Sequence, residues 1–165
     1  MILSNATEAT IDFFLGTLRE QNPKVIPSKI MSDFDKAQIK AIRNRHPESQ
    51  VFLCWWHVLH AWQQHIVISH YPELWNLLKG WIHLTDEAEF NECWTKIQAL
   101  APASFIEYIQ TYWLTVWPMW SAQERQDQTI FEFSETNMFV EAYIFPCCSD
   151  NLHNSHNILT VGITY

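Results

Sequence analysis

Two short apolar segments, each followed by a helical segment, constrain the fold of this 165-residue chain more than any other feature. The first, residues 25–31, is β-branched and bounded by proline, and residues 34–45 after it carry apolar side chains at helical spacing. The second, residues 50–54, leads directly into a predicted helix over 55–69. With another helix predicted over 6–21, the order helix–strand–helix–strand–helix predicts a parallel α/β layer.

The rest of the chain has a different pattern, without further predicted strands. Prolines separate amphipathic helical segments, which we expect over 72–82, 86–100, 102–115 and 134–145. All nine tryptophans lie between Trp55 and Trp120. No basic residues interleave with them, so we interpret them as the core of these helices rather than as a surface on which bases stack.

The charges are distributed unevenly along the chain. The formal net charge is −8, yet residues 1–50 hold seven of the ten basic residues and have a net charge of +1. The acidic balance of the whole chain argues against a free-standing basic nucleic-acid binder. Only three glycines are present, which excludes the glycine-rich loops of P-loop and dinucleotide-binding proteins.

No segment has the pattern of a targeting signal or a membrane span. The first residues lack a basic region and include Glu8 and Asp12, and the aromatic stretch over 104–120 is interrupted by polar residues and a proline. The four cysteines show no disulfide-framework spacing, which suits a reducing compartment. We therefore expect a nuclear or cytoplasmic protein that is neither secreted nor embedded in a membrane.

Three motifs carry chemically capable residues in a fixed order along the chain. Asp33 follows the first predicted strand and precedes an Ala- and Ile-rich helix. Cys54 and His57 form a Cys-x-x-His motif after the second strand. Glu141 ends the element Thr-Asn-Met-Phe-Val-Glu, which begins at Thr136.

In these motifs, over roughly residues 6–143, the sequence resembles the Mutator-like element (MULE) transposases. The resemblance implies a mainly helical α/β protein: part of a ribonuclease-H-like fold with a large all-helical insertion, which cuts and joins DNA at an Asp-Asp-Glu metal site. We expect a partial catalytic domain over 1–145, the insertion over about 58–130, and an irregular tail over 146–165.

The resemblance also implies roles for individual residues. Asp33 and Glu141 would be catalytic ligands of Mg²⁺ or Mn²⁺, and transposon-end DNA would be the partner. Such chemistry needs carboxylates because two hard divalent cations clamp the attacking and leaving oxygens of a phosphodiester. Cys54 and His57 would be packed structural residues near the site. The first catalytic Asp has no counterpart in this sequence, so we expect the polypeptide alone to be inactive.

Several alternatives remain open from the residues alone. Asp33 is equally well placed to cap the helix that follows it, a role compatible with metal binding. Cys54, His57 and His60 would form part of a zinc site, but no second pair stands at zinc-finger spacing, so we do not expect zinc; the remaining candidates, Cys147, Cys148, His153 and His156, are distant in the sequence. A helical protein-interaction module with a Trp-rich surface and no catalytic activity is the alternative function. An incomplete sheet would leave an apolar face uncovered, which predicts self-association.

Overall fold

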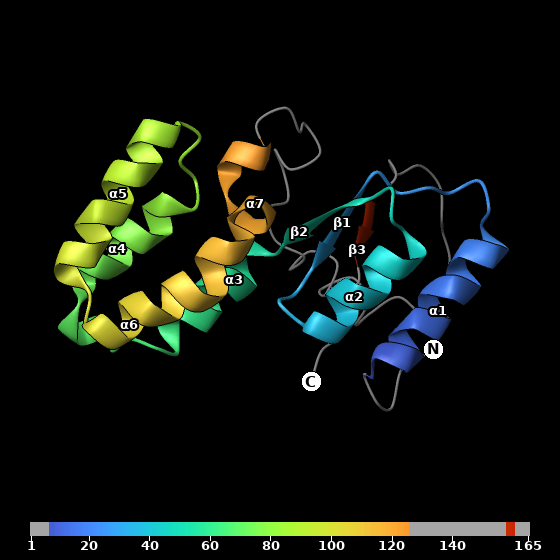
Figure 1. Cartoon of the computed structure of the whole chain (residues 1–165), viewed down its shortest axis with the longest axis horizontal. Helices are drawn as coiled ribbons and strands as arrows, with labels where there is room; N and C mark the ends of the chain where they lie inside the picture. The colour runs from blue at the N-terminus through green and yellow to red at the C-terminus, as the bar shows by residue number, and fades with distance from the viewer. Residues whose placement is uncertain (1–6, 126–157, 161–165) are drawn as a thin grey trace, which may run out of the picture. The chain divides into compact units, whose positions relative to one another are not determined.

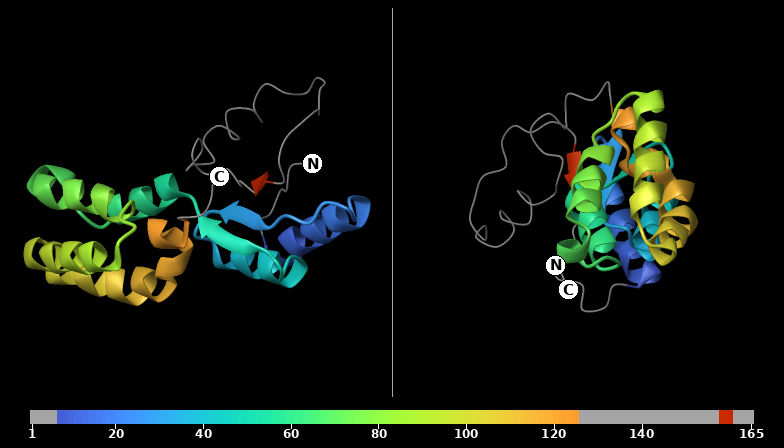
Figure 2. Two further views of the ribbon diagram at one scale, coloured as in Figure 1. Left: turned by 90° about the horizontal axis from the view of Figure 1, so that it is seen from above. Right: turned by 90° about the vertical axis from the view of Figure 1, so that its left-hand side faces the viewer.

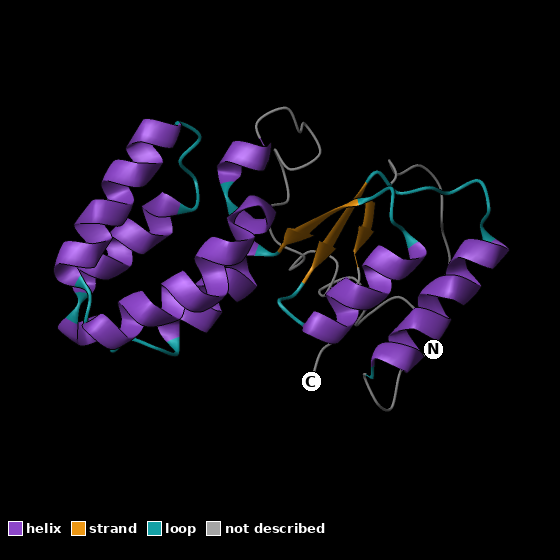
Figure 3. Ribbon diagram, viewed as in Figure 1, coloured by secondary structure: helices purple, strands orange, loops and turns teal. Residues whose placement is uncertain are grey.

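The computed structural model describes residues 7–125 and 158–160 (Figure 1). The chain divides into two compact units, one formed by residues 1–54 and 136–165 and the other by residues 55–135. Every described strand belongs to the first unit, and the described part of the second is helical (Figure 3). The protein is therefore mainly helical with a small parallel sheet, in line with the predicted class.

A small parallel sheet forms the centre of the first unit. Its strands lie in the order β2 (Gln50–Leu53), β1 (Lys29–Ser32) and β3 (Ile158–Thr160). The middle strand, β1, pairs in parallel with both neighbours, and Ile30 lies opposite Val51 in β2 and Leu159 in β3. The two predicted strands are thus present and adjacent.

The third strand differs from the sequence prediction. We expected irregular chain over 146–165, whereas its three described residues, Ile158–Thr160, pair with β1. Ile and Thr are β-branched and suit a strand, but three residues are too few to show the alternation from which a strand is predicted. Pairing with a strand about 130 residues earlier is a tertiary event that local sequence does not reveal.

Two helices cover one face of this sheet, α1 (Glu8–Gln21) and α2 (Lys36–Arg45), as Figure 2 shows from a second direction. Helix α2 is the crossover that two parallel neighbouring strands require. The buried cluster under these helices joins both of them to β1 and consists of Ile11, Leu15, Ile30, Ala41 and Ile42. This shared apolar contact is the main attachment of the helices to the sheet.

The opposite side of the sheet is also closed. Successive residues of a strand point to opposite faces, so Met31 and its partner Phe52 lie on the face away from Ile30. Their side chains are only 3% and 2% exposed. The self-association predicted for an uncovered sheet gains no support from these two residues.

Two predicted boundaries shift for identifiable reasons. The strand predicted over 25–31 begins at Lys29, because Pro27 has no N–H for a ladder and Val25 and Ile26 are exposed. The helix predicted over 55–69 ends at Gln63, shortly before the β-branched residues Ile66, Val67 and Ile68.

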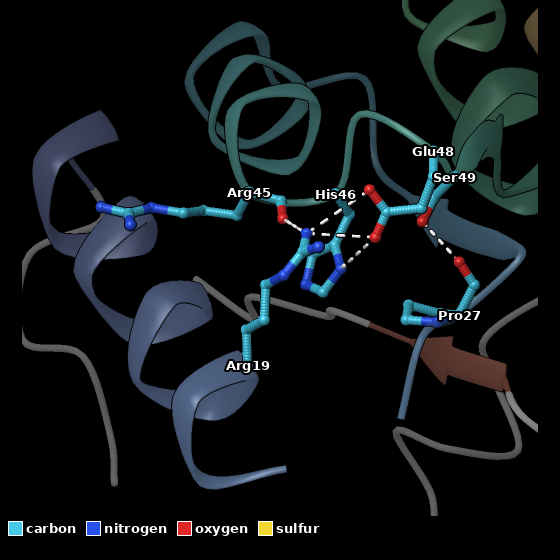
Figure 4. A network of polar contacts seen from close by, with 6 residues as sticks. All are labelled: Arg19, Pro27, Arg45, His46, Glu48 and Ser49. Carbon is cyan, nitrogen blue, oxygen red and sulfur yellow. Dashed lines mark hydrogen bonds and ion pairs between the residues drawn. The ribbon is translucent and has the colours of Figure 1, made fainter. Parts of the chain in front are cut away.

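A polar network ties the corner between α2 and β2 to α1 (Figure 4). The Arg19 guanidinium, from α1, donates to the carbonyl of Arg45 at the end of α2 and pairs with Glu48 Oε1 at 3.0 Å. It thereby satisfies one of the carbonyls left open at a helix C-terminus. The Ser49 hydroxyl donates to the carbonyl of Pro27, which joins this corner to the segment before β1.

His46 lies buried in the same network. Its Nδ1 is 3.7 Å from Glu48 Oε1. Burial lowers the pKa of His46, the nearby charge of Arg19 lowers it further, and Glu48 opposes both. The folded protein therefore favours the neutral imidazole at this corner.

The second unit consists of short helices joined by turns. Its α-helices are α3 (Trp55–Gln63), α4 (Pro72–Trp81), α5 (Glu87–Leu100), α6 (Ala103–Tyr108) and α7 (Trp117–Trp120). A π-helical turn over Ile109–Trp113 continues α6, and three short 3₁₀ segments lie over Ile68–His70, Leu114–Val116 and Ala122–Arg125. The helices predicted over 72–82, 86–100 and 102–115 are all present.

Tryptophans form the core of this unit. The four most deeply buried are Trp62, Trp81, Trp113 and Trp120. The Trp62 ring centroid lies 5.2 Å from that of Trp120 and 5.7 Å from those of both Trp81 and Trp113. The Trp120 indole N–H donates to the Trp113 carbonyl at 2.9 Å. The interpretation of the tryptophans as core is confirmed for these residues, while Trp56 is 48% exposed.

We predict that two glycine substitutions will differ in their effect on stability. Gly80→Ala should raise the free energy of unfolding by about 0.5–1 kcal/mol, because a Cβ there meets no atom within 4 Å and glycine is unfavourable in helices. Gly16→Ala should gain less, because its Cβ would lie 3.1 Å from Arg45 Cζ and disturb the ion pair of Arg45 with Asp12. Urea unfolding of both variants tests this. Equal gains would contradict it, and adding Arg45→Ala to Gly16→Ala should restore the missing gain.

We also predict that stability falls as the pH drops from 7.5 to 5.5. Because the folded pKa of His46 lies below its ordinary value of 6.5, the unfolded chain binds the proton more readily, so acidification below about 6.5 favours unfolding. Urea unfolding at both pH values should show a smaller loss in His46→Gln than in the wild type. The same loss in both proteins would show that His46 is not the group responsible.

Candidate functional site

The ends of β1 and β2 bring two of the predicted site residues to one edge of the sheet. Asp33 is the first residue after β1, and Cys54 is the first after β2. Ser32 and Leu53 are partners in the ladder, and the Cys54 N–H donates to the Ser32 carbonyl at 3.0 Å. Parallel sheets gather ligand-binding groups at this carboxyl edge, so the placement of Asp33 suits a functional role.

The backbone around Asp33 is held on the strand side. Ser32 is completely buried, and its hydroxyl donates to the Asp33 carbonyl at 3.0 Å. Asp33 itself is half-buried. The carboxylate thus stands at the rim of the sheet on a backbone fixed by the β1–β2 ladder.

The cap of α2 is Asp35, not Asp33. Asp35 Oδ1 accepts a hydrogen bond from the Gln38 backbone N–H at 2.7 Å, the contact that defines an N-cap. The alternative in which Asp33 caps the helix is therefore wrong. Sequence reasoning overlooked Asp35 because both carboxylates precede the helix, and only the exact helix start distinguishes them.

Cys54 and His57 lie in different surroundings. The Cys54 side chain is fully buried and is a free thiol at the end of the first unit. His57 is half-buried in the first turn of α3, in the second unit, with its ring edge-on to Trp56 at 4.7 Å. Their role as a packed structural motif stays a prediction.

A complete metal site does not arise from the described residues. Within residues 7–125 and 158–160, no three His, Cys, Asp or Glu side chains converge to hold a metal ion, and this includes the zinc combination of Cys54, His57 and His60. Asp33 fits the need for a hard oxygen ligand but supplies only one. Glu141 lies outside the described residues, as do the other zinc candidates, Cys147, Cys148, His153 and His156.

Sequence reasoning also missed a basic face on α2. It counted the basic residues of the first 50 positions without placing them. Lys36, Lys40 and Arg43 are all exposed and lie four and three residues apart, which puts them on one side of the helix. Their spacing alone would have revealed this face.

Comparison with known proteins identifies the first part of the chain. Residues 1–61 match the family model of the MULE transposase domain. The chain is related to the MULE transposases. No curated protein and no solved structure matched the chain.

The match covers the sheet edge described above. It includes α1, β1, α2 and β2 together with Asp33, Cys54 and His57. It does not extend to Glu141, so the MULE relationship is confirmed for the first two of the three motifs. In the described part of the chain, no helix is long and apolar enough to cross a membrane.

We predict that the two neighbouring aspartates affect stability differently. Asp35→Ala should lower the free energy of unfolding by about 1 kcal/mol, because it removes the cap of α2. Asp35→Asn should retain stability, since asparagine caps as well as aspartate does. Asp33→Asn should change stability less than Asp35→Ala does. Thermal unfolding of the three variants provides the measurement, and an equal loss in Asp33→Asn would contradict the assignment of the cap.

Proposed function

We propose that this chain carries part of a MULE-type catalytic domain of the ribonuclease-H-like class, which acts in metal-dependent cleavage and transfer of DNA strands. One observation carries the proposal: Asp33 stands at the carboxyl end of a parallel strand inside the segment related to MULE transposases. A carboxylate at that edge is where an open α/β sheet gathers catalytic and ligand-binding groups.

The proposed roles follow from the chemistry of phosphodiesters. Asp33 is one carboxylate ligand of Mg²⁺ or Mn²⁺, and Glu141 is the second. When bound, such cations neutralise the charge that develops on the attacking and leaving oxygens. The chain's own contribution is positional: the β1–β2 ladder and the Ser32 hydroxyl hold the backbone of Asp33, and the Asp35 cap sets where α2 begins.

Two carboxylates without a third hold a pair of cations poorly, because each missing ligand removes affinity and geometry together. We therefore expect the 165-residue polypeptide on its own to bind the metal without joining DNA strands.

The alternative, an interaction module with a Trp-rich surface, has less support. Such a module needs exposed tryptophans, whereas Trp55, Trp62, Trp81, Trp113 and Trp120 are buried and only Trp56 is largely exposed. Burial of these indoles stabilises the second unit and leaves little aromatic surface for a protein partner.

A metal titration of the full chain tests the proposal. Free Mn²⁺ is followed by its electron paramagnetic resonance signal as protein is added. Asp33→Asn and Glu141→Gln should each weaken Mn²⁺ binding by at least about tenfold, a loss that even a residue behind the ligands commonly causes. Asp35→Asn is the matched control, since its carboxylate lies two residues away and serves as a helix cap.

Two outcomes separate the parts of the proposal. Unchanged Mn²⁺ affinity in Asp33→Asn overturns the metal role of this residue. Nicking or joining of DNA by the purified chain with Mn²⁺, lost on Asp33→Ala, supports the metal role and overturns the expected inactivity.

A further inference from the structure

The outer face of α2 is basic along its whole length. Its exposed residues are Lys36, Lys40, Arg43 and Asn44, and the helix contains no acidic residue. At 1.5 Å of rise per residue, the three cations extend over about 10 Å of the helix axis. They form a continuous stripe, which we call the α2 basic face (Lys36, Lys40 and Arg43).

The inner face of α2 fixes the direction of this stripe. Gln38, Ile39, Ala41 and Ile42 are buried, and the last two belong to the cluster shared with α1 and β1. The helix cannot rotate about its axis without exposing these side chains. The α2 basic face is therefore held toward solvent by the same packing that builds the unit.

Other cations of this unit serve the fold, which distinguishes them from the α2 basic face. Arg45 pairs with Asp12 of α1, and Arg19 binds Glu48 and the carbonyl at the end of α2. Lys40 does have an acidic partner, since its Nζ lies 2.9 Å from Glu8 Oε1. That pair is solvent-exposed, and exposed pairs contribute little to stability, so a competing anion can replace Glu8.

We propose that the α2 basic face binds the phosphate backbone of DNA. This inference rests on the proposed function in naming DNA as the partner, and it assigns the surface that contacts it. Lys and Arg recognise phosphate oxygens through charge-assisted hydrogen bonds, and such contacts position DNA without reading its sequence.

The composition of the face favours phosphates over an acidic protein. A protein interface has an apolar or aromatic centre that excludes water, whereas the exposed residues of α2 are only Lys, Arg and Asn. Phosphate binding needs no apolar centre, because release of condensed counterions supplies much of the affinity. The face also lies in the part of the chain with a net charge of +1, whereas the rest carries −9.

Salt-dependent DNA binding tests this assignment. The full chain is titrated against a fluorescein-labelled duplex of arbitrary sequence, in EDTA, at NaCl concentrations from 50 to 200 mM. The triple variant Lys36→Gln/Lys40→Gln/Arg43→Gln should bind more weakly. It should also lose about 2.7 from the slope of log K against log salt, about 0.9 for each phosphate contact. Glutamine has a helix propensity close to that of Lys and Arg, so α2 should stay folded, as circular dichroism will check.

Two further variants make the test specific. Lys79→Gln/Lys96→Gln removes two cations from helices of the second unit and should leave the slope unchanged. Glu8→Gln removes the carboxylate that competes for Lys40 and should raise DNA affinity by about threefold, the effect of about one additional phosphate contact. A general effect of net charge would instead make the control variant lose as much affinity per cation as the triple variant.

The inference is overturned if the triple variant keeps the wild-type slope, or if the control loses as much per cation. It is also overturned if poly-L-glutamate binds the α2 basic face more tightly than DNA does at equal charge, which would identify an acidic polypeptide as the partner. Asp33→Asn should bind DNA normally in EDTA. Failure here thus leaves the Mn²⁺ experiment unaffected, and failure of that experiment leaves this one interpretable.

Discussion

The parallel pairing of β1 with β2 is the constraint on which the first unit depends. Two adjacent parallel strands cannot be joined by a tight turn, so the chain must cross over through α2. The crossover packs its apolar side against α1 and Ile30, which leaves its polar side exposed. One pairing thereby places Asp33 at the carboxyl edge and turns the α2 basic face toward solvent.

The two units reach stability by different means. The first combines a small aliphatic cluster with a polar network, in which Arg19 closes the end of α2 and neutral His46 is buried beside it. The second relies on large aromatic side chains that contact one another edge-on or tilted, the arrangements that aromatic pairs prefer. Buried indoles such as Trp81 and Trp120 donate to backbone carbonyls, which offsets the cost of removing their N–H groups from water.

Local sequence predicted the elements better than their limits. The helices of the second unit follow from apolar periodicity and proline spacing, both of which are local signals. The start of β1 was misplaced because Pro27 and the exposed Val25 and Ile26 lie in an apolar run that resembles a strand. The capping aspartate was misassigned for a related reason: a displacement of two residues decides whether Asp33 or Asp35 meets the first N–H groups of α2.

The MULE relationship could be recognised from residues alone, because Asp33 and the Cys54–His57 motif lie at fixed distances along the chain. The place of Glu141 relative to Asp33 stays a prediction, since it depends on chain outside the described residues.

The sequence by itself determined the order of helices and strands, the tryptophan-rich character of the second unit and the kinship with MULE transposases. These depend on residue type and spacing, which are local properties. Only the tertiary structure decided that β3 pairs with β1, that Asp33 and Cys54 share one edge, and that Arg19 closes the end of α2. Each of these joins residues that are distant in sequence, and their pairing is selected by the free energy of burying the shared core rather than by any local preference.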